Sequence, residues 1–202
     1  MKTKNLFALA GLALLLTACI PSVNPFYTDK DIVFDPRLLG EWKTPDAKEE
    51  SWRFEDAGNK KYKFTITESN GKHGEFDARL FKLKDSLFLD IQPAKLELKE
   101  DQAEMVGAAL IPGHLLIRIR EIGPTLKADF FDWDWLGKYL KKNPKALAHR
   151  SITDSEGIML TADTRALQKF VLAHLKEDEL FEVENEGGMI RSTNAPPAAP
   201  AK

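Results

Sequence analysis

The residues that could do acid–base or metal chemistry in this sequence are, first of all, four histidines. They are scattered along the chain at His73, His114, His149 and His174. No two of them stand at the short spacing with which one helix or strand holds a metal ion. We therefore expect solvated or hydrogen-bonded histidines, and we predict no metal ion and no cofactor.

Three closely spaced aspartates, Asp129, Asp132 and Asp134, are the next candidates. Their spacing lacks the loop glycine and the terminal glutamate of a calcium-binding loop. Helix capping by Asp132 or Asp134, with Asp129 at an outward strand position, explains them better than a metal or acid–base cluster. The sequence also has no Gly-x-Ser-x-Gly element and no serine placed beside a base. We predict that the protein is not an enzyme.

The single cysteine, Cys19, has the clearest chemistry. Lys2 and Lys4 precede an apolar run from Leu6 that ends in Leu16-Thr17-Ala18-Cys19. This run has the basic start, apolar middle and small-residue end of a secretory signal, and it is too short to span a bilayer permanently. A plain cleaved signal and an N-terminal anchor helix are the alternatives to a modified cysteine.

The four closing residues resemble a bacterial lipobox at all four positions. In that family the chain is cut before the cysteine, whose thiol and new amino group are acylated with fatty acids such as palmitate. The resemblance implies a lipoprotein signal peptide over residues 1–18 and a membrane anchor at Cys19. Ile20 follows, and in enterobacterial lipoproteins a residue other than aspartate there favours transport to the outer membrane. The implied location is the cell envelope, at the outer membrane.

The processed chain is large enough for one domain. Removal of the signal leaves 184 of the 202 residues, and the loss of Lys2 and Lys4 leaves 27 of the 29 basic residues against 31 acidic ones. This balance lacks the concentrated basic charge that a nucleic-acid partner needs. With its cysteine acylated, the chain has no thiol for disulfides or metals, so its core must hold by packing alone.

The elements that must position any site are mostly strands. Apolar and polar residues alternate over residues 50–55, 61–67, 75–80, 87–91, 114–122 and 126–130. Turn residues such as Asn70-Gly71 and Gly123-Pro124 separate the stretches. Short strands joined by tight turns predict an antiparallel meander, and a meander of this length tends to close because closure removes exposed edges.

The pattern changes to a helical period after Asp132. Asp132 or Asp134 caps a first predicted helix, which Asn143-Pro144 ends, and Asp163 or Thr164 caps a second one. The apolar stripes of the two helices are Leu136, Tyr139 and Leu140, and then Leu167, Phe170, Val171 and Leu175. One more short strand is predicted at 158–161.

Asp35 is expected to cap a short turn that has Pro36 at its first position. The stretch from Asp35 to Trp42 resembles the start of lipocalin and lipocalin-like domains, where a short 3₁₀ turn leads into Gly-x-Trp on the first strand. The resemblance implies a mainly β fold, an antiparallel lipocalin-like barrel of about eight strands with two late α-helices, in which Trp42 closes one barrel end. The Thr-Asp-Tyr turn of lipocalins is absent. Asn24-Pro25-Phe26-Tyr27, followed by the Leu-x-Gly-x-Trp of residues 38–42, is similar to a group of uncharacterised bacterial lipoproteins.

These patterns divide the chain into four parts. We expect the signal peptide at 1–18, a tether at 19–35, the β-barrel domain with its C-terminal helix at 36–182, and a disordered tail at 183–202.

The apolar residues that face the barrel interior are the candidate binding site. Those expected to line a ligand are Tyr62, Phe64, Ile66, Phe76, Leu80, Ile117, Ile119 and Phe130. A barrel of about eight strands is near the size at which side chains fill the interior or leave room for one ligand. Trp133 and Trp135 either lie at a barrel mouth or cover a helix–sheet junction.

The expected function is that of a membrane-anchored envelope lipoprotein that binds a small apolar ligand or lipid in its barrel. The alternative is a structural or assembly lipoprotein that acts through contacts with an envelope protein.

Overall fold

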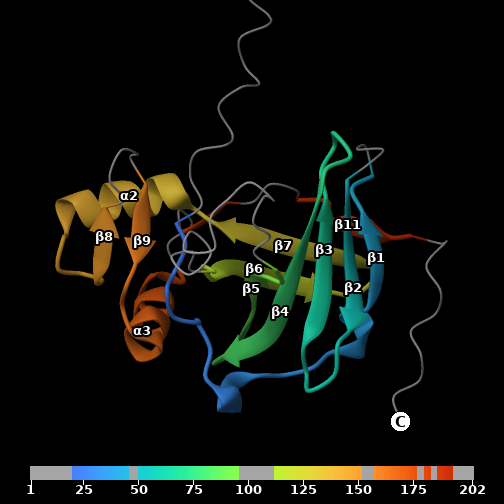
Figure 1. Cartoon of the computed structure of the whole chain (residues 1–202), viewed down its shortest axis with the longest axis horizontal. Helices are drawn as coiled ribbons and strands as arrows, with labels where there is room; N and C mark the ends of the chain where they lie inside the picture. Colours follow the sequence, from blue (N-terminus) through green and yellow to red (C-terminus); the bar gives the residue numbers. More distant parts are fainter. Residues whose placement is uncertain are drawn as a thin grey trace, which may run out of the picture.

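The structure is a computed structural model of the chain, and it describes residues 20–45, 50–95, 112–151, 157–176, 180–182 and 186–192. Cys19 and the signal segment lie outside the described residues. Within them the chain forms a closed antiparallel barrel of eight strands, with two helices and a small hairpin packed on one side (Figure 1). The predicted fold class is therefore confirmed.

The barrel strands follow one another as neighbours, as expected of a meander. They are β1 (Gly40–Lys43), β2 (Ser51–Asp56), β3 (Tyr62–Thr67), β4 (His73–Leu83), β5 (Ser86–Pro93), β6 (Leu115–Ile122), β7 (Thr125–Phe131) and β11 (Met189–Arg191). The predicted turn at Asn70-Gly71 joins β3 to β4, with Gly71 at φ 78°, where glycine carries no Cβ penalty.

The barrel closes through a strand that the sequence did not indicate. β11 pairs with β1 on one side and with β7 on the other, placing Arg191 opposite Trp42 and Met189 opposite Leu126. The short β10 (Phe181–Glu182) pairs with the far end of β7. Residues 183–202 were expected to form a disordered tail, and this is wrong for 189–191. Three residues are too few to establish a period of two, and their partners are distant in sequence.

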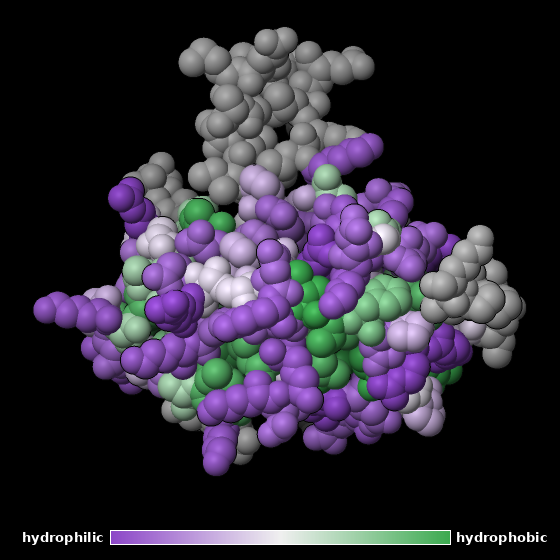
Figure 2. Space-filling view, turned by 90° about the horizontal axis from the view of Figure 1, so that it is seen from below, coloured by the Kyte–Doolittle hydropathy of each residue, from purple (hydrophilic) through white to green (hydrophobic). Residues whose placement is uncertain are grey.

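A short 3₁₀ helix, η2 (Pro36–Leu38), closes the end of the barrel where β1 begins. The Asp35 side chain caps it by accepting a hydrogen bond from the Arg37 amide, as the sequence predicted. Trp42 is fully buried and donates its indole N–H to the Leu38 carbonyl at 2.9 Å. The expectation that Trp42 closes one barrel end is thus confirmed. Figure 2 looks onto the molecule from below, where hydrophobic atoms form a central band among hydrophilic residues.

The second layer packs on the outside of the barrel. It contains α2 (Trp133–Lys142), α3 (Thr164–His174) and the hairpin of β8 (His149–Ser151) and β9 (Ile158–Leu160). Asp132 caps α2 and Asp163 caps α3, so both predicted helices are confirmed. Outward-facing residues of the barrel, such as Phe81 and Phe88, pack against these helices in a core separate from the barrel interior.

The segment expected to be a tether is built into the fold from Ile20 onward. Ile20 and Phe26 are buried in the core between the barrel and the helical layer. The Ser22 amide and carbonyl each bond to the backbone of His114, and η1 (Asp29–Asp31) follows. Alternating apolar residues signal strands and helices only, so this irregular segment carried no pattern that predicted its burial.

Candidate functional site

The eight predicted ligand-lining residues all belong to the core cluster of the barrel interior. Their exposure divides them into two groups. Five are buried to 3% exposure or less: Tyr62, Phe64, Leu80, Ile117 and Ile119. The other three, Ile66, Phe76 and Phe130, are only half-buried. The structure thus brings the predicted residues together, but it separates a packed interior from an accessible end.

Aromatic rings fill the packed part. Phe54 and Phe64 stack with ring centroids 4.4 Å apart and planes 5° from parallel. Trp52 contacts Phe64 edge-on at 5.2 Å. Rings at these distances form favourable offset and T-shaped contacts and leave no gap between them for another molecule. This part of the interior is a hydrophobic core, as in a small filled barrel.

Tyr62 has a structural role at the closed end. Its hydroxyl accepts a hydrogen bond from the Asp35 amide at 2.7 Å and donates one to the Asp35 carbonyl at 3.2 Å. Phe34 stacks on its ring at 4.8 Å. Burial raises the pKa of Tyr62 to about 12, so the phenol keeps its proton and can donate. Tyr62 holds the start of η2 against the barrel.

The half-buried residues lie at the opposite end of the barrel. Ile66 is paired with Gly74 next to the β3–β4 turn, and Phe76 is paired with Pro93 at the end of β5. We call this end the mouth and define it by four half-buried apolar residues from four strands: Ile66, Phe76, Leu115 and Phe130.

Neighbouring side chains hold the mouth residues in place from below. The Phe130 ring contacts Trp52 edge-on at 5.7 Å, and the Phe76 ring lies 6.1 Å from Phe64. A Cβ at Gly74 would lie 3.1 Å from the Phe76 ring, so this glycine leaves room for that ring. The mouth is therefore a shallow apolar surface on a rigid floor of aromatic rings. Apolar contact of this kind suits an acyl chain or another apolar group.

A buried acidic group that the sequence analysis missed lies outside the barrel, on β5. Asp90 is 2% exposed; one of its oxygens accepts a hydrogen bond from the Phe26 amide at 2.8 Å, and the other lies 2.7 Å from His114 Nδ1. Burial raises the pKa of the Asp90 carboxyl, against the opposing effect of His114. A carboxyl group in an otherwise apolar strand was the signal available in the sequence.

This Asp–His pair has the parts of an acid–base dyad, but none of the residues that the structure describes forms a hydrogen bond to it as a nucleophile would. The nearby Ser22 is fully buried, donates its hydroxyl to the Asn24 carbonyl at 2.7 Å and accepts from the Asn24 amide. The pair instead fixes the N-terminal segment to the barrel, because Asp90 binds the Phe26 amide directly.

The three aspartates considered as a possible metal or acid–base cluster have separate structural roles. Asp129 is fully buried and binds Arg118 and Arg120, with Nε–oxygen distances of 2.8 and 2.7 Å. Asp132 caps α2 and Asp134 is exposed in its first turn. No group of three or more metal-binding side chains comes together in the part of the chain that the structure describes.

Trp133 and Trp135 cover the junction of the helices with the barrel. Trp133 packs edge-on against Phe131 at 5.7 Å, and Trp135 stacks on Tyr139 at 4.9 Å and lies near Phe170 of α3. Both belong to the outer core and not to the barrel interior. Of the two interpretations of the sequence, the helix–sheet junction is confirmed.

Comparison with known proteins adds no assignment, since no family model, curated protein or solved structure matches this chain. Among the described residues, no helix has the length and apolar character needed to cross a membrane.

Proposed function

We propose that this chain is a lipid-anchored protein of the bacterial cell envelope, at the outer membrane, that binds an apolar group of a lipid or small molecule at the mouth of its barrel. The observation that carries the proposal is the group of four half-buried apolar residues from four strands at the mouth, which lies above a packed layer of aromatic rings. Apolar side chains that stay partly accessible and gather at one end of a rigid scaffold are typical of ligand sites.

The filled interior limits what the site can take. Phe54, Phe64 and Trp52 are in mutual contact below the rim and leave no room for a ligand between their rings. The ligand we propose therefore inserts only its apolar end, such as the terminal part of an acyl chain, and leaves its polar part outside.

The anchor supports the same function. The resemblance of residues 16–19 to a lipobox supports acylation of the cysteine directly before Ile20. An acylated protein works at a membrane, where acyl chains are the most abundant apolar ligands. Incorporation of labelled palmitate during expression tests the anchor, and loss of the label in Cys19→Ser confirms its position.

Two isoleucines provide a matched test of the mouth. Ile66 lies in the mouth, whereas Ile190 on β11 lies outside it and is 48% exposed. We expect Ile66→Asn to weaken the binding of a fluorescent fatty acid about tenfold, the loss of roughly 1.4 kcal/mol of apolar contact. Ile190→Asn should change the affinity less than about twofold. Equal affinities for wild type and Ile66→Asn would refute a mouth site.

An assembly function is the second candidate, and the helical layer favours it. Four apolar residues of this layer are half-buried: Trp135 and Tyr139 on α2, Leu172 on α3 and Leu175 at the C-cap of α3. Aromatic residues such as the first two are enriched in protein interfaces. Native mass spectrometry of protein purified in gentle detergent separates the two functions. A co-purifying lipid supports binding at the mouth, whereas an unliganded mass with a stable envelope protein supports assembly.

A further inference from the structure

The folded domain begins at Ile20, directly after position 19. Ile20, the residue after Cys19, is already buried at 5% exposure. The Pro21 carbonyl accepts a hydrogen bond from the Leu160 amide at 2.8 Å, and Ser22 is bonded to His114 in both directions at 2.9 Å. A lipid attached at position 19 would therefore hold the domain directly against the membrane, without the flexible linker that would let it turn freely.

This attachment point lies at the mouth end of the barrel. His114, which binds Ser22, immediately precedes β6, and the next residue, Leu115, belongs to the mouth. In Figure 1 the first described residues, in dark blue, begin beside α2, and the chain then runs down to η1 at the opposite, lower end.

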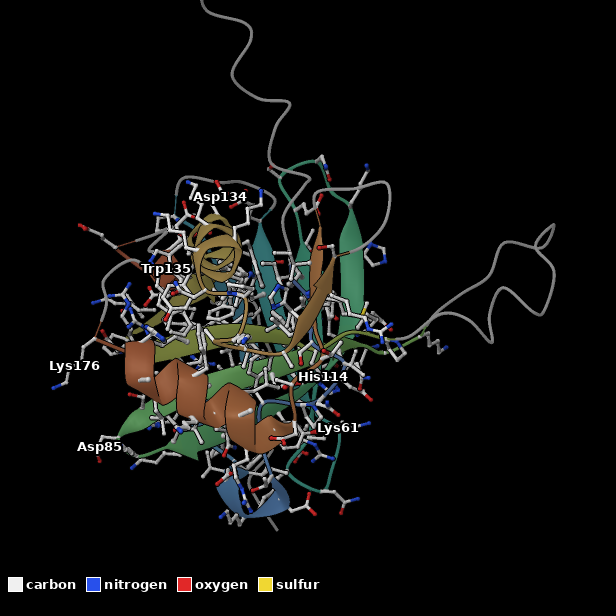
Figure 3. All side chains as sticks on the ribbon, turned by 90° about the vertical axis from the view of Figure 1, so that its left-hand side faces the viewer. Lys61, Asp85, His114, Asp134, Trp135 and Lys176 are labelled. Carbon is white, nitrogen blue, oxygen red and sulfur yellow. The ribbon has the colours of Figure 1, made fainter. Side chains whose placement is uncertain are left out.

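The helix beside this point has an outer face rich in lysine. Lys138 and Lys141 follow Asp134 at positions i+4 and i+7, so these three share one face, and Lys142 flanks it. All four side chains are exposed, whereas Leu136 and Leu140 on the other face are buried. In Figure 3, Asp134 lies at the top of α2, and Asp85 of the β4–β5 turn lies far below it.

These lysines carry unbalanced positive charge. Several lysines on the barrel have acidic partners, for example Lys61 with Asp77 at 3.1 Å and Lys127 with Glu121 at 2.9 Å. Lys138, Lys141 and Lys142 form no ion pair with any residue in the described ranges. Unpaired lysines on an exposed helix face attract an anionic surface.

We propose that the lysine face of α2 docks on a bilayer that contains anionic phospholipids and that, together with an acyl anchor at Cys19, it turns the mouth toward the membrane. This inference rests on the lipid anchor of the proposed function. The bilayer is favoured over an acidic protein because an anchor one residue away from the buried Ile20 brings a bilayer to this face at high effective concentration. The half-buried Trp135 and Tyr139 beside the lysines suit the interfacial region of a membrane.

The first test measures docking without the anchor. The protein used begins at position 19 and carries Cys19→Ser, so it keeps every described residue. Its binding to vesicles that contain phosphatidylglycerol is compared with its binding to vesicles of pure phosphatidylcholine. Each lysine near an anionic surface contributes about 5-fold, so Lys138→Gln/Lys141→Gln should reduce the partition coefficient on anionic vesicles about 25-fold. The matched control is Lys30→Gln/Lys82→Gln, two exposed lysines of η1 and β4, and we expect a change below about 2-fold.

The second test measures orientation with a matched pair of probes. Asp134 and Asp85 are both exposed aspartates at opposite ends of the molecule, so Asp134→Cys and Asp85→Cys change the charge equally. Each is introduced into the acylated protein, labelled with a fluorophore, and reconstituted in vesicles that contain a brominated lipid. We expect quenching of the probe at position 134 and none at position 85.

The outcomes are separable from those of the proposed function. If the protein incorporates palmitate but the two probes are quenched equally, or if the two glutamine pairs bind vesicles alike, the docking proposal is wrong while the anchor stands. If Lys138→Gln/Lys141→Gln leaves vesicle binding intact but abolishes co-purification of an acidic protein, the face binds that protein and the proposal is also overturned. Loss of palmitate incorporation would instead remove the anchor on which the proposal rests.

Discussion

Replacing Arg191 by alanine should loosen the closed end of the barrel. The guanidinium lies 4.3 Å above the Trp42 ring and donates to the carbonyl groups of Leu39 and Arg37, each at 2.6 Å. Arg191 thereby ties the last strand to the first one and to the chain that leads into it. Since β11 has only three residues, these contacts are a large share of what holds it in place.

The expected loss in the free energy of unfolding is estimated from these three contacts. Each contact is given a low value because Arg191 is exposed. A cation–π contact at an exposed site is worth about 0.5–1 kcal/mol, and each partly solvated hydrogen bond about 0.5–1 kcal/mol. The expected loss in the free energy of unfolding is about 2 kcal/mol. With a urea m-value of about 2 kcal/mol/M, the unfolding midpoint should fall by roughly 1 M.

The assay is urea unfolding followed by tryptophan fluorescence, with Arg53→Ala as the control. Arg53 lies on the neighbouring β2 and its side chain is 53% exposed, with a single 3.5 Å contact to Glu41, so its loss should cost no more than about 0.5 kcal/mol. Arg191→Lys keeps the positive charge but loses the planar guanidinium, so its urea midpoint should lie between those of Arg191→Ala and Arg53→Ala. Equal midpoints for Arg191→Ala and Arg53→Ala would show that the contacts of Arg191 do not hold the barrel closed.

Three further predictions concern stability. Gly113→Ala should destabilise by about 1–3 kcal/mol, because the new Cβ would lie 2.5 Å from the Cβ of Pro21 and push away the N-terminal segment; an unchanged melting temperature would contradict this. Gly137→Ala, inside α2 with only Ile158 at 4.0 Å, should stabilise by about 0.5–1 kcal/mol in the same melts, and a lower melting temperature would argue against it. Burial raises the pKa of the Asp90 carboxyl, so between its unfolded and folded pKa values the folded state holds a proton that the unfolded state has lost. The contribution of Asp90 to stability therefore falls as pH rises through this window. The urea midpoint of wild type minus that of Asp90→Asn should therefore decrease between pH 3 and 6, and a difference that does not change with pH would refute the assignment.

Much of the barrel was predictable because strand patterning is local. The alternation of Phe64 and Ile66 with polar neighbours indicates which face of β3 is buried before any partner is known. Helix caps are equally local, which is why Asp132 and Asp163 were found among the candidates. Asp35 capped a 3₁₀ turn as expected for the same reason.

The parts that the sequence did not reveal depend on pairing over long distances. The Asp90–His114 contact joins residues 24 positions apart, and β11 meets β1 across almost the whole chain. The burial of Ile20 and Phe26 depends on a helical layer formed more than a hundred residues later. No window of neighbouring residues contains these contacts, so no period or cap could indicate them.

The sequence by itself determined most of the barrel strands, the two capped helices and the apolar row inside the barrel, because periodicity and capping are properties of adjacent residues. Only the tertiary structure decided how that row is used. It packs Phe64 and Leu80 into a solid core, and it leaves Ile66, Phe76 and Phe130 accessible at one end. Whether an apolar residue is buried or accessible depends on which side chains, distant in sequence, cover it. In a closed barrel this burial is fixed only once the last strand, β11, pairs with the first, β1.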